Sequence, residues 1–164
     1  MSEGAKRLLI DTNVWLDYFL PARSGHQQAR MLFEGAFGKD VDLLFASTTV
    51  KDVFFIASSS YKRELHEERG RITEADSRAI NVMCWAIAAS MEEMATPVGV
   101  DASDLWLAEK YRSLHKDLED NLILAAAQRA KADVLVTCDE GLIKHAPLPA
   151  LTPLDAIAYV SMEL

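Results

Sequence analysis

The sequence lacks the features that mark secreted and membrane proteins. Its 164 residues contain only two cysteines, Cys84 and Cys138, which make no disulfide framework, so a reduced, cytoplasmic compartment is expected. No apolar run approaches the roughly 20 residues of a membrane span. No signal peptide is visible either, because Asp11 interrupts the N-terminal apolar stretch. We therefore expect a soluble protein with no membrane segment.

Positive charge is also scarce. The 17 Lys and Arg residues face 25 Asp and Glu residues, which gives a formal net charge of −8. Proteins that coat nucleic acid are basic, so charge alone is mildly unfavourable to RNA binding. A nuclease is not excluded, because clustered active-site acids add negative charge that metal ions offset locally. The length fits one domain, 1–164, with a sizeable core, and 50% hydrophobic and 26% charged residues are ordinary for a globular protein.

Short apolar segments alternate with helical patterns along the chain. Strands are predicted near Arg7–Ile10, Val41–Ala46, Pro97–Val100 and Asp133–Thr137. Such alternation is typical of a parallel sheet whose faces are covered by helices. We therefore predict an α/β fold with a mainly parallel sheet of four or five strands flanked by helices.

Several helix boundaries can be predicted from local signals. Thr73–Asp76 resembles a capping box, and Thr152–Pro153 is a strong helix start. The polar segment Ser58–Thr73 is predicted to extend a solvated helix that ends at Gly70, although its basic residues could instead touch phosphates. Pro147–Pro149 is predicted to be a loop before the last helix.

Acidic residues follow two of the predicted strands. Asp11 ends the apolar run Leu8–Ile10, and Asp139 comes just after the strand Asp133–Thr137. Carboxyl ends of parallel strands meet at one edge of a sheet, where ligands bind. Either acid could simply cap the next helix. Because clusters of perturbed acids favour functional sites, we predict that Asp11 and Asp139 bind a metal ion.

Two more acid positions are expected at the same edge. Asp117 and Asp120 open a helix, with Asp117 as its N-cap and Asp120 able both to stabilise the first turn and to serve the site. Asp52 lies in the helix after the second strand. Gathered carboxylates repel one another, so something must neutralise them. Oxygen ligands without Cys/His pairs indicate Mg²⁺ or Mn²⁺ as the cofactor.

Neighbouring polar side chains can orient these acids. Thr12, Asn13 and Thr137 are candidates to position carboxylates or a metal-bound water, together with Asp117. Thr137 could equally be an ordinary strand residue. His115 adjoins the acidic helix start and could contact a phosphate, but it is predicted to be an ordinary surface residue.

The acids and their neighbours form an ordered set of four short motifs. They are Asp11-Thr12-Asn13, Asp52, Asp117-Leu118-Glu119-Asp120 and Thr137-Cys138-Asp139. The set resembles that of PIN-domain ribonucleases, of the kind found as the VapC toxin of toxin–antitoxin pairs, and the resemblance runs from Leu8 to about Val160. The family more often has Glu at position 52 and usually Ala at position 121.

The resemblance implies a PIN-like three-layer sandwich, hydrolysis of RNA that leaves a 5′-phosphate, and a small antitoxin protein as partner. The hydrolysis predicted from the residues uses a metal-activated water. Asp11, Asp120 and Asp139 would be the principal metal ligands, and Asp52 would be the fourth catalytic acid, either completing the ligand shell or orienting water. A stand-alone RNA-processing nuclease would fit the same residues.

Two functions outside this family fit the sequence less well. A phosphatase of the haloacid dehalogenase type would need a second Asp two residues after Asp11, where this chain has Asn13. A non-catalytic interaction module is disfavoured, because unneeded clustered charges cost stability. The apolar stripe Ile80–Met94, with Trp85 beside it, further predicts a homodimer. The alternative is that this helix is sandwiched within its own domain.

Overall fold

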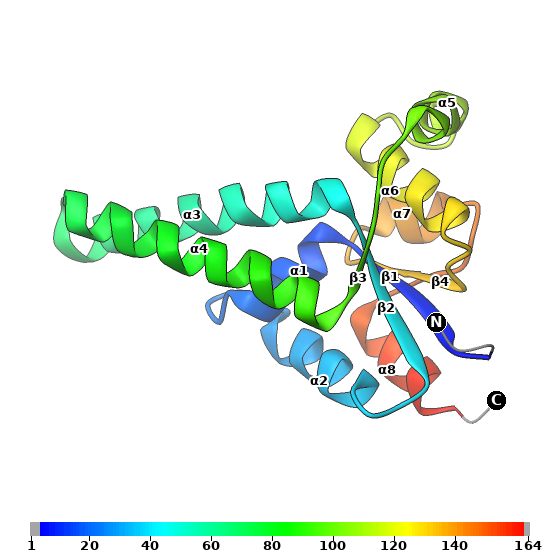
Figure 1. Cartoon of the computed structure of the whole chain (residues 1–164), viewed down its shortest axis with the longest axis horizontal. Coiled ribbons are helices and arrows are strands. Elements are labelled where there is room, and N and C mark those ends of the chain that lie inside the picture. The colour runs from blue at the N-terminus through cyan, green and yellow to red at the C-terminus, as the bar shows by residue number, and fades with distance from the viewer. Residues whose placement is uncertain (1–3, 163–164) are drawn as a thin grey trace.

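The central sheet is parallel throughout. The computed structural model describes residues 4–162, which form five strands and eight helices (Figure 1). The strands are β1 (Lys6–Ile10), β2 (Val41–Ala46), β3 (Thr96–Val98), β4 (Val134–Val136) and β5 (Ala150–Leu151). Their order is β3-β2-β1-β4-β5, so β1 is central and pairs with both β2 and β4. The predicted α/β fold with a parallel sheet is confirmed.

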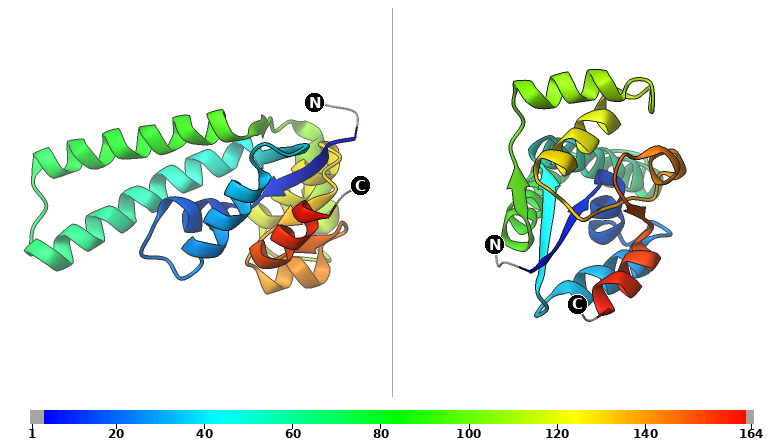
Figure 2. Two further views of the ribbon diagram at one scale, coloured as in Figure 1. Left: turned by 90° about the horizontal axis from the view of Figure 1, so that it is seen from below. Right: turned by 90° about the vertical axis from the view of Figure 1, so that its right-hand side faces the viewer.

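Helices cover both faces of this sheet. They are α1 (Thr12–Phe19), α2 (His26–Ala36), α3 (Ser47–Arg69), α4 (Glu74–Met94), α5 (Ala102–Tyr111), α6 (Leu118–Arg129), α7 (Glu140–His145) and α8 (Pro153–Ser161). Successive strand residues point to opposite faces. Leu8 and Ile10 therefore pack with α1, α2, α3, α4 and α8, whereas Leu9 packs with α5, α6 and α7 (Figure 2). The predicted three-layer sandwich is confirmed.

The four predicted strand positions are found, with small shifts, and the structure adds a fifth strand, which the predicted count of four or five allows but which had no predicted position. The third strand is Thr96–Val98 instead of Pro97–Val100. The fifth, Ala150–Leu151, follows directly after the predicted loop Pro147–Pro149 and pairs with β4. Two residues are too few to produce an alternating pattern, so sequence periodicity could not reveal this strand.

The predicted helix boundaries are confirmed. Thr73 and Asp76 form a reciprocal capping box at the start of α4. Thr152 caps α8, whose first residue is Pro153. The solvated extension of α3 runs to Arg69 and ends at Gly70, whose φ of 72° is a left-handed conformation that glycine adopts without strain.

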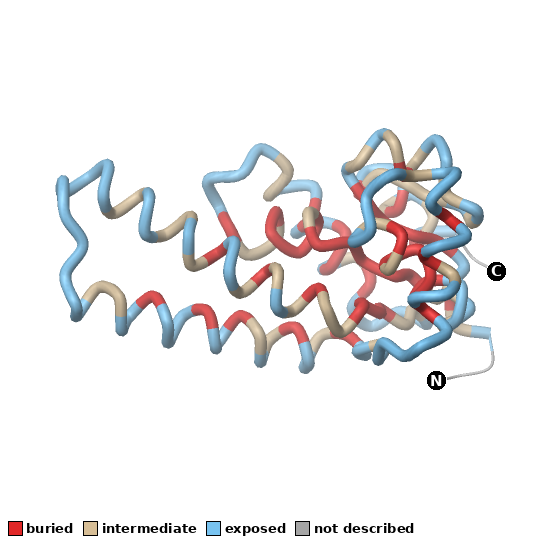
Figure 3. Tube along the Cα trace, turned by 90° about the horizontal axis from the view of Figure 1, so that it is seen from above, coloured by how far each residue is buried: buried red, intermediate tan, exposed pale blue. Residues whose placement is uncertain are grey.

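Helices α3 and α4 form a long antiparallel hairpin that projects from the sheet (Figure 1). Red buried positions line its inner side, and the tip is pale blue and exposed (Figure 3). Ile80, Cys84, Ile87 and Met91 of α4 are buried in the chain's own core. Most of the predicted apolar stripe is therefore packed within the domain. Trp85, beside the stripe, remains 65% exposed.

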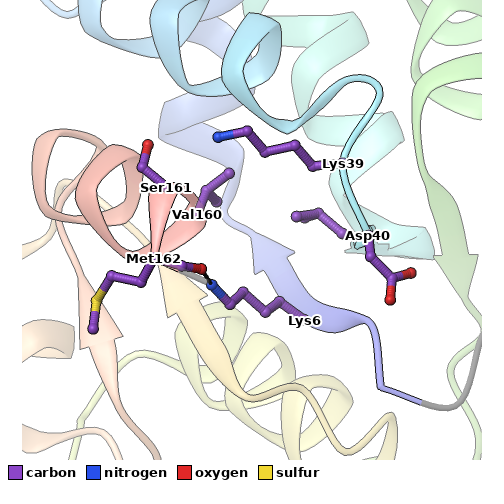
Figure 4. Close-up of a pocket in the computed structure, with 7 residues that line it drawn as sticks. Lys6, Lys39, Asp40, Val160, Ser161 and Met162 are labelled. Atoms are coloured by element: carbon purple, nitrogen blue, oxygen red, sulfur yellow. Dashed lines mark hydrogen bonds between the residues drawn. The ribbon is translucent and has the colours of Figure 1, made fainter. Parts of the chain in front are cut away.

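A buried lysine at the start of the central strand β1 forms hydrogen bonds to the end of the last helix, α8. The Lys6 side chain donates hydrogen bonds to the carbonyl oxygens of Tyr159, at 2.8 Å, and Met162, at the end of α8. A cavity of about 480 Å³ opens beside it, between Lys39 and Ser161 (Figure 4). Helix carbonyl ends favour a cation, so Lys6 is satisfied by the backbone. In residues 4–162 we find no helix with the length and apolar character to cross a membrane.

Candidate active site

Asp11 is the most enclosed acid at the carboxyl edge of the sheet. It follows β1 directly and is 3% exposed. Its carboxylate accepts hydrogen bonds from the Thr12 backbone N–H at 2.6 Å, the Asn13 amide at 2.7 Å and the Thr137 hydroxyl at 2.7 Å. Burial raises the pKa of Asp11, and these three hydrogen bonds oppose the rise, while the charge of Asp139 adds to it. Three donors thus stabilise a buried charge that would otherwise be costly.

Thr137 and Asn13 join the ends of β1 and β4. The Thr137 hydroxyl, which donates to Asp11, also accepts the backbone N–H of Asp139 at 3.0 Å. The side-chain oxygen of Asn13 accepts the backbone N–H of Cys138 at 3.0 Å. Both side chains therefore hold the loop that carries Asp139 against the loop that carries Asp11. This contact supports the orienting role predicted for them.

Asp117 and Asp139 each cap a helix. One oxygen of Asp117 accepts the backbone N–H groups of Glu119, at 2.8 Å, and Asp120, at 3.3 Å, at the start of α6. One oxygen of Asp139 accepts the N–H of Leu142, at 2.8 Å, in α7. Capping and a role in the site are thus compatible, because each carboxylate keeps a second oxygen free of these bonds.

Asp120 is in contact with a histidine. Its carboxylate lies 3.1 Å from Nδ1 of His115. Burial raises the pKa of Asp120 to about 6; His115 opposes the rise, and the charges of Asp11, Asp117 and Asp139 add to it. The charges of Asp11 and Asp139 therefore act on Asp120, although these three acids come from separate elements.

Asp52 contacts a further acid, Glu119. The Asp52 side chain is 16% exposed, and its Oδ1 lies 3.0 Å from Nζ of Lys51. A hydrogen bond to Asp52 raises the pKa of Glu119 to about 7, and burial and the negative charges of Asp52 and Asp117 add to that rise. Two carboxyl groups can hydrogen-bond only while one of them is protonated, which the raised pKa of Glu119 allows below about pH 7.

The acids surround one cleft of about 250 Å³. Its lining combines residues from the starts of α1, α6 and α7 with apolar side chains of the flanking helices: Asp11, Thr12, Asn13, Leu16, Ile56, Asp117, Glu119, Asp120, Ile123 and Asp139. Three of the four predicted catalytic acids therefore come together here. Within residues 4–162, Asp52 lies beside Glu119 and is not among the residues that line the cleft.

The donors of the cleft suit a hard divalent cation in their chemistry. They are carboxylate oxygens, and the hydroxyl of Thr12 is buried with no hydrogen-bond partner among the described residues. Across residues 4–162, no three His, Cys, Asp or Glu side chains are placed to hold a metal ion together. Asp120 instead contacts His115, and Asp139 caps α7. Binding one ion to all three carboxylates would therefore require side chains of the cleft to move closer together.

Two residues of the site were missed in the sequence. Glu119 belongs to one of the four motifs, but the sequence indicates no role for it, because its contact with Asp52 joins two elements that are far apart in the sequence. His115 was expected on the surface, but its side chain is only 22% exposed and touches Asp120. A histidine five residues before a predicted site acid was the only available signal.

Comparison with known proteins agrees with this arrangement of a parallel α/β sandwich and an acidic cleft at its carboxyl edge. The family model described as PIN domain matches residues 7–141. This match covers most of the sequence, so the chain belongs to the PIN domain family. No curated protein matches it in sequence.

Solved structures of toxins share the fold. VapC20 of Mycobacterium tuberculosis, a toxin that cleaves the sarcin–ricin loop, has 14% identity and a TM-score of 0.56, over 81% of this chain and 90% of that one. VapBC2 of Rickettsia felis, bound to a promoter DNA fragment, has 14% identity and a TM-score of 0.60, over 89% of this chain and 98% of that one. A toxin–antitoxin complex from Klebsiella pneumoniae has 20% identity and a TM-score of 0.56, over 89% of this chain and 97% of that one.

We predict that the metal-free protein loses stability as the pH rises from about 4.5 to 7.5. Asp120 and Glu119 bind protons more tightly when folded, with pKa values of about 6 and 7 against ordinary values of 3.8 and 4.5. Their contribution is therefore fully present below about pH 4 and is lost as the pH passes through those raised values. Asp76 and Asp101, whose pKa values are lowered, act only below this window. Thermal unfolding in the presence of a chelator measures the trend.

The matched controls are Asp120→Asn and Glu119→Gln, which remove one titrating group each. Both variants should flatten the pH dependence of the melting temperature. A wild-type melting temperature that rises steadily over this interval would contradict the assignment.

Proposed function

We propose that this chain is a metal-dependent endoribonuclease, a single PIN-like nuclease domain spanning residues 1–164, and that it is the toxin of a toxin–antitoxin pair. The observation that carries the proposal is the cleft that Asp11, Asp120 and Asp139 line in a member of the PIN domain family. Carboxylates from three separate elements gather there despite their mutual repulsion. Such an arrangement favours a functional role over a structural one.

The chain's own residues would hold the ion and position the substrate. Asp11, Asp120 and Asp139 would bind Mg²⁺ or Mn²⁺, and Asp52 completes the acid set. When bound, the cation supplies Lewis-acid activation of water and stabilises the leaving oxygen of the phosphodiester. Thr137 and Asn13 keep the Asp11 carboxylate in a fixed orientation. That fixed orientation reduces the reorganisation needed during reaction.

Neither a covalent cysteine nor an aspartyl-phosphate mechanism is supported. Burial and the nearby Asp17 raise the pKa of the Cys138 thiol to about 11, so it stays protonated at neutral pH. The amide of Asn13 stands where a phosphatase of the haloacid dehalogenase type would need its second acid, and it donates to Asp11.

A small antitoxin protein is the proposed partner, and the cytoplasm the proposed location. Two similar structures are described as VapBC2 and as a toxin–antitoxin complex. A crowded carboxylate cleft would bind an inserted Arg or Lys of such a partner, which would compete with the metal ion. Both cysteines are free thiols, as expected in a reducing compartment.

A homodimer is proposed through the exposed face of the α3–α4 hairpin. Trp85 is 65% exposed and Phe55 is 62% exposed, and both border a groove of about 250 Å³. The Trp85 and Phe54 rings meet edge to face at 5.4 Å, which holds Trp85 in place. Exposed, ordered aromatic side chains of this kind are typical interface anchors.

We predict that Asp11→Asn and Asp139→Asn each reduce Mn²⁺-dependent RNA cleavage by at least about 100-fold, because a metal-holding acid contributes no less than its supporting residues do. The folded state should persist, since removing a carboxylate also removes repulsion. Rates on a labelled RNA, with circular dichroism as the folding check, measure both effects. Glu93→Gln, an exposed acid outside the cleft, is the control. Cleavage by Asp11→Asn at the wild-type rate would refute the mechanism.

We expect the chain to purify from its native host with a small partner that blocks cleavage. Separating the two should release nuclease activity, and adding the partner back should suppress it. Native protein that carries no partner yet cleaves RNA would instead be a stand-alone RNA-processing nuclease.

We predict a solution mass of about 36 kDa, twice the 18.2 kDa of one chain. Trp85→Glu should reduce this mass to that of a monomer, because a charge would be buried in the apolar interface. Trp106→Glu, on α5, is the matched control, since Trp106 is 56% exposed but lies outside this groove. Light scattering at micromolar concentration decides the matter. A wild-type mass near 18 kDa would exclude the dimer.

A further inference from the structure

Glu119 is placed to serve the cleft that the predicted fourth acid, Asp52, does not line. Glu119 is a lining residue of the cleft together with Asp11 and Asp120, and it also contacts Asp52 on α3. We propose that Glu119 brings the fourth carboxylate into the cleft and that Asp52 acts through it as a positioning residue. This inference rests on the proposed nuclease function.

The capped start of α6 fixes the position of the Glu119 backbone. Asp117 caps the helix and accepts the Glu119 N–H at 2.8 Å, so Glu119 sits in the first turn, directly before Asp120. Its side chain reaches across to α3 and meets Asp52 there. Glu119 therefore links the helix that carries Asp120 to the helix that carries Asp52.

The contacts of Asp52 suit it to position Glu119. Its Oδ1 lies 3.0 Å from Nζ of Lys51, and its carboxyl group hydrogen-bonds Glu119. The Lys51 cation offsets the charge of Asp52. Glu119 is then the member of the pair whose side chain lines the cleft, where a cation would bind.

A simpler explanation for Glu119 is that an acid in the first turn stabilises the α6 helix dipole. Glu140 offers a matched comparison, because it also follows a capping aspartate in the first turn of a helix, is exposed, and is not a lining residue of the cleft. A dipole effect would make Glu119→Gln and Glu140→Gln behave alike. A role in the cleft would make only Glu119→Gln affect metal binding and cleavage.

The experiment measures Mn²⁺ binding to the full chain by the rise in melting temperature during a MnCl₂ titration, and RNA cleavage in parallel. Glu119→Gln should weaken apparent Mn²⁺ binding by about 10- to 100-fold and slow cleavage, while Glu140→Gln should change neither. Asp52→Asn should have a smaller effect. The double variant Asp52→Asn/Glu119→Gln should be no worse than Glu119→Gln alone, because Asp52 acts through Glu119.

A rescue variant tests the supporting role directly. Glu119→Ala should lose Mn²⁺ affinity, and Glu119→Ala/Asp52→Glu should regain part of it, because the longer acid on α3 can extend toward the cleft. Wild-type Mn²⁺ binding by Glu119→Gln, or fully additive losses in the double variant, would overturn the proposal. If Asp11→Asn abolishes cleavage while Glu119→Gln does not affect Mn²⁺ binding, the nuclease function stands and this inference fails.

Discussion

The carboxylate of Asp11 is almost completely buried, and hydrogen bonds from the surrounding residues of the site stabilise it there. Its three hydrogen-bond donors come from the start of α1 and from the end of β4, so the two strands must be neighbours for the carboxylate to be satisfied. The sheet order places β4 directly beside β1. Because an unpartnered buried charge costs several kcal/mol, roughly, the sheet topology and the site depend on each other.

The same dependence explains why so much could be predicted from the sequence. Strands buried on both faces are nearly continuous apolar runs, and Leu8–Ile10 is such a run ending abruptly in Asp11. A parallel sheet then brings Asp11 and Asp139 to the same edge whatever the lengths of the intervening segments. Helix boundaries such as Gly70 and Thr73 were equally accessible, because caps depend on residues adjacent in the chain.

What could not be predicted depends on where side chains meet across distant elements. The contact between Asp52 and Glu119 joins α3 to α6, and no local pattern encodes it. The contact between His115 and Asp120 depends on the fold of the short loop before α6. Strand β5 exists because a neighbouring strand offers it backbone partners, not because Ala150–Leu151 has strand character of its own.

The place of β1 also sets when the cleft can form during synthesis. Asp11 and Thr137, which hydrogen-bond to each other, are separated by 126 positions in the chain. At typical elongation rates of about 5–20 residues per second, roughly 6 to 25 s pass between the synthesis of the two residues. Until β4 emerges, Asp11 lacks the Thr137 donor and the cleft lacks Asp139. The assembled cleft therefore cannot exist before both β1 and the loop after β4 have been synthesised.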